Sequence, residues 1–431
     1  MDNGVKTLKY LIVFLSLTFN LAIAGGNEVI KHILPNKATI LYKETSGKGI
    51  ISGVIFIKGG SVEDPKGKKG LNHLLFKMLL KRTENLTGLE INKVFEDSGG
   101  HISTSSGEEF STIEFAIKLE DFQNGMNVLK EVLYKPVFEK EKLKQEINNT
   151  IAQINAKKEE GFSYALDELR KEIYKNTPYE TSPLGIPEDL KNITVKDLKE
   201  RHKQILQGGR FIISIVGDLP YKEVEPILND VFGKLENKNY QYKKVNIKIS
   251  KANKKEINRE GAQSTIVVAY NAPKAREEGY FAFKVLNSIL GNGFTSRLFQ
   301  ELREKRGLAY AVGSFYPSKI NVGNMFAYIG TAPEKTEKSL NGIIDVVNSI
   351  KNGITQEELE IAKEKLIGHF LLDSQTREKQ AFYLGFFETI GLGYETFNKY
   401  VEKIQSVKEK QVLNVYNKYI PEGYFAVIVK P

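Results

Sequence analysis

The stretch GRFIISIV at residues 209–216 and the stretch GYFAVIVK at residues 423–430 share one apolar pattern at a distance of 214 positions. Each has the length and composition of a buried strand, and each follows a segment in which apolar residues recur at helical spacing, residues 193–206 and 406–420. A helix that leads into a buried strand therefore occurs twice. We expect two related halves.

Two further pairs of segments support a duplication. Residues 138–154, FEKEKLKQEINNTIAQI, resemble residues 354–370, ITQEELEIAKEKLIGHF, and IISGVIFIKGG at 50–60 resembles STIVVAYNAP at 264–273. Within the first half, residues 112–119 alternate between apolar and polar side chains, which is typical of a half-buried antiparallel strand. Each half is therefore predicted to be α+β, a mainly antiparallel sheet with helices packed on one face.

The composition is that of an ordinary globular protein. The chain has 431 residues, 41% hydrophobic and 27% charged, which is enough for two or three domains with large cores. Membrane bundles and small disulfide scaffolds are excluded, and long disordered segments are not expected. Because the chain contains no cysteine, thiolate metal sites and thiol nucleophiles are excluded as well.

Positive charge is in excess, at a formal +9, but most of it is dispersed along the chain. The one dense run is residues 234–255, where eight lysines accompany a single acidic residue, Glu236. This run lacks apolar periodicity, so we interpret residues 234–257 as a solvated linker and not as a nucleic-acid patch. The linker would separate domains at residues 25–233 and 258–431.

The N-terminus has the pattern of a secretory signal peptide. Lys6 and Lys9 precede the apolar run 10–24, which ends in Ala-Ile-Ala, a small-residue cleavage pattern. The alternative is an uncleaved anchor, but about 15 apolar residues fall short of the ~20 that span a bilayer. We expect cleavage of residues 1–24, and a mature chain 25–431 that is exported to the periplasm or the cell exterior without a membrane span.

The histidines do not form a local metal motif. There are five, His32, His73, His101, His202 and His369, and no two of them have the HExxH or HxxH spacing that places two imidazoles on one face of a helix.

The segment GLNHLLFKMLL at residues 70–80 nevertheless resembles the pitrilysin and insulinase family of inverzincin metallopeptidases. Their helix reads roughly G-L-A-H-F-x-E-H-M-x-F, in which both histidines bind zinc and the glutamate is the general base. On this pattern His73 occupies the first ligand position. Phe76 stands in place of the base and Lys77 in place of the second ligand.

The family takes its remaining zinc ligand from a glutamate in a later segment, E-R-x-x-V-x-x-E-I. The matching stretch is EINNTIAQI at residues 146–154, in which Glu146 keeps the first glutamate and Gln153 occupies the ligand position. A neutral amide is a weak zinc ligand, and Lys77 would place a positive charge beside the metal. The resemblance therefore implies that this chain holds no zinc, and that His73 is a partly buried structural histidine.

The second half is closer to the family. LGNGFTSRLFQELREKRGLAYAV at residues 290–312 resembles its segment L-G-x-G-x-x-S-R-L-F-x-x-L-R-E-x-x-G-L-A-Y. In the family the arginine holds substrate and the tyrosine stabilises the oxyanion, roles that fall here on Arg303 and Tyr310. The alternative is structural, a salt-bridged arginine and a tyrosine that opens a strand. Shorter matches at 34–37, 59–65, 181–190 and 215–224 extend the resemblance over residues 29–431.

Some members of the family are heterodimers in which one subunit carries the zinc motif and the other the arginine and tyrosine. This chain resembles the second kind, which implies a half-clamshell of two αβ domains, inactive alone. Its expected partners are a homologous subunit with an intact HxxEH motif, which would hold the zinc, and a peptide added at a sheet edge. A non-proteolytic scaffold protein and a peptidase with a rebuilt metal site are the alternatives.

Overall fold

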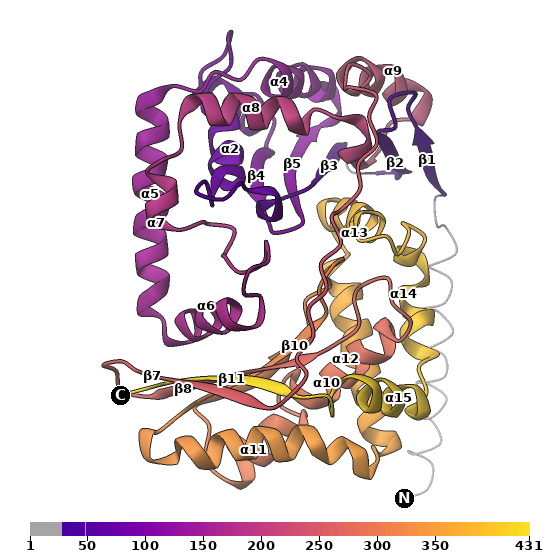
Figure 1. Cartoon of the computed structure of the whole chain (residues 1–431). Helices are drawn as coiled ribbons and strands as arrows, with labels where there is room; N and C mark the ends of the chain where they lie inside the picture. Colours follow the sequence, from indigo (N-terminus) through magenta and orange to yellow (C-terminus); the bar gives the residue numbers. More distant parts are fainter. Residues whose placement is uncertain (1–27, 48) are drawn as a thin grey trace, which may run out of the picture.

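A computed structural model describes residues 28–47 and 49–431 (Figure 1). The predicted signal peptide, residues 1–24, lies outside the described residues. The first sheet has the strand order β1-β2-β6-β3-β5-β4. Its strands are β1 Val29–Ile33, β2 Thr39–Glu44, β3 Ile50–Lys58, β4 His101–Ser106, β5 Phe110–Lys118 and β6 Phe211–Gly217.

The second sheet has the order β7-β11-β8-β10-β9. Its strands are β7 Asn253–Asn258, β8 Ser264–Asn271, β9 Ala311–Phe315, β10 Asn324–Thr331 and β11 Tyr424–Lys430. With β1 set aside, the first sheet reads β2-β6-β3-β5-β4, which is the same order of equivalent strands. The pairs β2–β6 and β7–β11 are parallel, and every other pair of the two sheets is antiparallel. The predicted mainly antiparallel sheets and the duplication are confirmed.

Helices connect the strands in both halves. The first half contains α2 Leu71–Leu79, α3 Gly88–Glu96, α4 Phe122–Tyr134, α5 Lys140–Glu159, α6 Gly161–Ile173, α7 Pro187–Leu190, α8 Val195–Ile205 and α9 Tyr221–Phe232. The second contains α10 Tyr280–Gly291, the π-helix η4 Phe299–Lys305, α11 Thr336–Asn348, α12 Gln356–Asp373, α13 Arg377–Thr389, α14 Thr396–Gln405 and α15 Glu409–Tyr419. Short 3₁₀ turns are η1 Ser61–Glu63, η2 Leu119–Asp121, η3 Gly208–Arg210, η5 Pro333–Lys335 and η6 Ser349–Asn352.

Local sequence explains where several helices begin. Thr87, Thr194 and Thr355 each accept a hydrogen bond from the backbone three residues on, where an acidic side chain bonds back to the threonine. These reciprocal bonds satisfy backbone N–H groups that have no partner inside the helix. They start α3, α8 and α12 at fixed positions.

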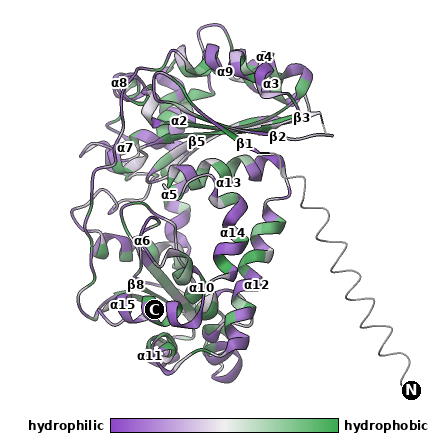
Figure 2. Ribbon diagram, turned by 90° about the vertical axis from the view of Figure 1, so that its right-hand side faces the viewer, coloured by the Kyte–Doolittle hydropathy of each residue, from purple (hydrophilic) through white to green (hydrophobic). Residues whose placement is uncertain are grey.

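One helix of each half crosses to the sheet of the other half. α13 packs on β3 and β6 of the first sheet, and α6 packs on β8 and β11 of the second, as Figures 1 and 2 show from two sides. Ala381 and Leu384 of α13 join Phe56 in one buried cluster, and Ala165 and Leu169 of α6 join a second. The helices of each half cover one face of their own sheet, as predicted, and the opposite face is covered from the other half.

The linker contains more order than its sequence indicates. No helix or strand occurs in residues 233–252, but β7 takes up 253–258 and so includes the end of the predicted linker 234–257. The linker is held against both halves, because the Tyr242 hydroxyl donates to the Glu109 carbonyl at 2.8 Å and Ile249 N–H donates to the Asn271 side chain at 3.0 Å. Among the helices that the structure describes, none is long and apolar enough to cross a membrane.

Candidate functional site

The helix α2 that carries three of the site positions is fixed at its start by a buried carboxylate. Asp64 accepts hydrogen bonds from the N–H groups of Gly70 at 2.8 Å and Asn72 at 2.9 Å. The buried Asn72 side chain in turn accepts from Arg201, at 3.2 Å from two guanidinium nitrogens, and donates to Ser111 at 2.7 Å. A capped, hydrogen-bonded start of this kind fixes both the position and the rotation of α2.

His73, in the first turn of α2, is 7% exposed, and its Nε2 atom is buried without a hydrogen-bond partner. Burial, and to a lesser degree the positive charge of Lys77, lowers the pKa of His73 to about 4. The imidazole is therefore neutral at pH 7. A neutral imidazole is the form that binds metals, so the remaining positions decide whether a metal fits.

Those positions supply no further ligand. Phe76 is 1% exposed and belongs to the main core of the first half, whereas Lys77 points to solvent. On α5, Gln153 is exposed, and Glu146 forms an ion pair with Lys81 at 2.9 Å. No group of three His, Cys, Asp or Glu side chains among residues 28–47 and 49–431 could hold a metal ion. The residues present therefore do not fit the zinc site of the family.

Arg303 and Tyr310 lie together at one end of the second sheet. The Arg303 Nη1 atom donates to the Tyr310 carbonyl at 3.0 Å, and the guanidinium carbon lies 5.2 Å from the centre of the Phe299 ring. In the part of the chain that the structure describes, Arg303 forms no ion pair with a carboxylate. The salt-bridged arginine of the structural alternative is therefore not observed.

Tyr310 directly precedes β9, the edge strand of the second sheet, and its N–H donates to the Gly330 carbonyl at 2.8 Å. The residue is 62% exposed, and its hydroxyl makes no hydrogen bond to any described residue. The Arg303 side chain is thus held by a backbone carbonyl and Tyr310 by its own backbone N–H, while the Tyr310 hydroxyl and the exposed Arg303 guanidinium face solvent.

The structure does not bring the two groups of positions together within this chain. His73, Phe76, Lys77 and Gln153 lie on α2 and α5 of the first half, while Arg303 and Tyr310 belong to the second. No hydrogen bond or ion pair joins the two groups across the described residues.

Sequence reasoning missed two aromatic neighbours of the pair. Phe299 lies under the Arg303 guanidinium, and Phe294, in the preceding loop, is 75% exposed and touches Phe299 edge to face. The motif contains both residues, but a sequence pattern does not tell an exposed phenylalanine from a buried one.

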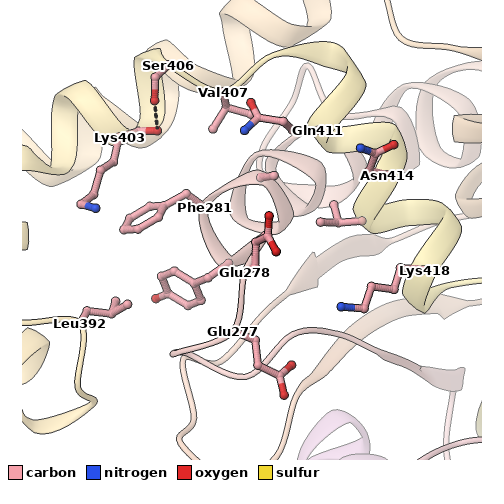
Figure 3. Close-up of a pocket in the computed structure, with 14 residues that line it drawn as sticks. Glu277, Glu278, Phe281, Leu392, Lys403, Ser406, Val407, Gln411, Asn414 and Lys418 are labelled. Carbon is pink, nitrogen blue, oxygen red and sulfur yellow. Dashed lines mark hydrogen bonds between the residues drawn. The ribbon is translucent and has the colours of Figure 1, made fainter.

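A separate pocket of about 510 Å³ opens beside the start of α10, away from these positions (Figure 3). Its labelled lining residues include Phe281 with Lys403 on one side and Lys418 with Asn414 on the other. None of the sequence-predicted site residues lines it.

Comparison with known proteins places the chain in a family. Residues 39–185 match the model described as insulinase (peptidase family M16), and residues 192–366 match the model described as peptidase M16 inactive domain.

Relatives match along most of the chain. A Helicobacter pylori protein named non-peptidase homolog YmxG is 28% identical, covering 88% of this chain and 89% of that protein. A Rickettsia felis protein named uncharacterized zinc protease is 25% identical, covering 88% and 91%. The crystal structure of a peptidase M16 inactive domain from Pseudomonas fluorescens superposes with a TM-score of 0.87 at 25% identity, over 94% of this chain and 98% of that one. The protein therefore belongs to the insulinase family of peptidases, M16.

Proposed function

We propose that this protein is the non-catalytic, substrate-binding subunit of an exported heterodimeric zinc peptidase that acts on peptides or unfolded segments. One contrast supports the proposal. Among the zinc-site positions His73 is the only side chain that commonly binds zinc, and it is buried. Arg303 and Tyr310, in contrast, are both exposed, and the Arg303 guanidinium bonds the Tyr310 carbonyl but not its hydroxyl. The partner would be a homologous subunit with an intact HxxEH motif, which would hold the zinc.

The names of the relatives agree with such a division of labour. The Helicobacter relative is called a non-peptidase homolog, while others in the same family are called zinc proteases. The signal-peptide pattern of residues 1–24 would bring this subunit to the periplasm or the cell exterior. The partner would then be exported as well.

The chemistry that this chain could add is electrostatic. Arg303 uses one of its five N–H groups on the Tyr310 carbonyl, which leaves the others for a substrate carbonyl or carboxylate. The Tyr310 hydroxyl can donate to an oxyanion that develops on the peptide bond. The partner would supply the zinc that activates water.

The test begins with the purified chain and its zinc content after dialysis. We expect almost no zinc and no hydrolysis of unfolded casein by the chain alone. When the intact-motif partner is added, hydrolysis should appear, and Arg303→Ala or Tyr310→Phe should lower its turnover. A partner complex that cuts at the wild-type rate with either variant would contradict a shared site.

Two outcomes would favour the alternatives. Copurification from the native envelope with proteins that lack HxxEH would favour a scaffold role. One tightly held zinc per chain, lost on His73→Ala, would mean that the metal site has been rebuilt.

A further inference from the structure

Beside the arginine and tyrosine lies a surface of three exposed residues, Phe294, Arg303 and Tyr310, together with the half-buried Phe299. We call it the aromatic–arginine surface. Phe294 is among the most exposed large apolar residues of the described chain, at 75%. Single exposed apolar side chains are common on proteins and need no function. This one differs because it is rigidly held and continuous with a polar pair.

The loop that carries Phe294 is fixed by hydrogen bonds to the residues before and after it. The Ser296 N–H and hydroxyl both donate to the Gly293 carbonyl, and the Gln300 side chain donates to the Phe294 carbonyl at 2.7 Å. Lys365 reaches over from α12 to the Asn292 carbonyl at 2.5 Å and the Thr295 hydroxyl at 2.8 Å.

Two glycines let the loop take this shape. Gly293 has a φ of 83°, in the left-handed region that other residues rarely adopt. A Cβ atom at Gly291 would overlap the backbone nitrogen of Ser314 on β9. The loop backbone is thus seated against the same edge strand that Tyr310 precedes, and these contacts fix where Phe294 leaves the main chain.

The ring of Phe294 begins a row of contacts that ends at the polar pair. Its centre lies 5.1 Å from that of Phe299 at an interplanar angle of 78°, and Phe299 lies beneath the Arg303 guanidinium. Arg303 then bonds the Tyr310 carbonyl. Apolar surface and hydrogen-bond donors are therefore adjacent, and together they can contact an apolar side chain and the peptide group next to it.

We propose that the aromatic–arginine surface selects peptides by an apolar, preferably aromatic, side chain, which Phe294 receives while Arg303 holds a neighbouring carbonyl or carboxylate. This inference rests on the proposed function and names Phe294 as its specificity-determining residue. An aromatic ring added edge-on to Phe294 should strengthen binding by about 2- to 10-fold over a small polar side chain.

The test uses the purified chain and fluorescein-labelled unstructured peptides that are identical except for one central residue, Phe, Leu or Ser. Fluorescence anisotropy should give the tightest binding for the Phe peptide and the weakest for the Ser peptide. Phe294→Ala should bring the Phe-to-Ser ratio close to one. The control Leu89→Ala removes an equally exposed apolar side chain, 76% exposed on α3, and should leave the ratio unchanged.

Three outcomes would overturn the inference. They are a wild-type chain that binds no peptide, a Phe294→Ala chain that keeps the preference, and a Phe294→Ala chain that keeps peptide binding but no longer copurifies with its homologous subunit. The last would make the surface a subunit contact. If Arg303→Ala lowers turnover of the complex while Phe294→Ala keeps the preference, the inference fails and the proposed function stands. If Arg303→Ala has no effect on turnover, the proposed function fails first.

Discussion

The helix α2 and the segment 290–312 come from two halves of one fold, yet the aromatic side chains at their predicted site positions have opposite surroundings. On α2, Phe76 stands at the position of the family's general base, and its side chain is buried in the core. In 290–312, Phe294 and Tyr310 remain in solvent on a backbone that is firmly hydrogen-bonded. A buried apolar side chain such as Phe76 already contributes to the packing of the core, whereas an exposed apolar side chain such as Phe294 gains contacts only when something binds it.

The largest expected effect is on stability at Phe76. Phe76→Ala should lower the free energy of unfolding by about 3–5 kcal/mol, because it leaves a cavity in a closely packed core. Phe294→Ala should change it by less than about 0.5 kcal/mol, since the ring is already in solvent. Urea unfolding of both variants measures the contrast. Equal losses would mean that the two positions do not differ as described.

The second largest effect is expected on catalysis, from substitutions in the segment 290–312. In the complex with the intact-motif partner, Arg303→Ala or Tyr310→Phe should lower turnover by the ~10²- to 10³-fold typical of a lost oxyanion donor. Lys77→Ala is the control from α2 and should leave turnover unchanged, because that side chain is exposed and has no role in the proposed mechanism. Turnover rates at saturating casein test both. If Lys77→Ala lowered turnover as much as Arg303→Ala, α2 and the segment 290–312 would not differ in their contribution to catalysis.

The third prediction concerns pH. The pKa of His73 is about 4 in the folded chain and about 6.5 when unfolded, so between these values the unfolded chain binds a proton that the folded chain does not. The free energy of unfolding should therefore fall as pH drops from 6.5 towards 4, by about 3 kcal/mol from this residue.

His73→Gln should remove that part of the pH dependence. Urea unfolding at a series of pH values between 4 and 7 measures the slope for the variant and the wild type. An unchanged slope would show that His73 is accessible to protons in the fold, in conflict with its burial.

The smallest effect is expected at Lys77 itself. Lys77→Ala should change the free energy of unfolding by no more than about 0.5 kcal/mol, because the side chain is on the surface. The same urea titration detects it. A loss of several kcal/mol would indicate that Lys77 holds α2 in place, which would extend the structural role of that helix to its solvent face.

The duplication and the sheets could be predicted because strands such as 211–217 and 424–430 repeat a dense apolar pattern. The packing of α6 and α13 on the sheet of the opposite half could not be predicted, because the sequence repeat does not tell which sheet each helix covers. β7 was missed since its residues are mostly polar and only its pairing with β11 makes it a strand.

The candidate site shows the same limit. The family motif identifies Arg303 and Tyr310, but not that η4 is a π-helix nor that Arg303 bonds the Tyr310 carbonyl. The exposure of a side chain depends on the whole fold, so the sequence alone does not predict that Phe294 is exposed.

The crossing helices also set an order of events during synthesis. When the ribosome has finished β6, the first sheet is complete in hydrogen bonds, yet the face that includes Phe56 stays bare until α13 has been made. An N-terminal fragment would therefore be prone to aggregate, and the halves should not fold well when expressed separately.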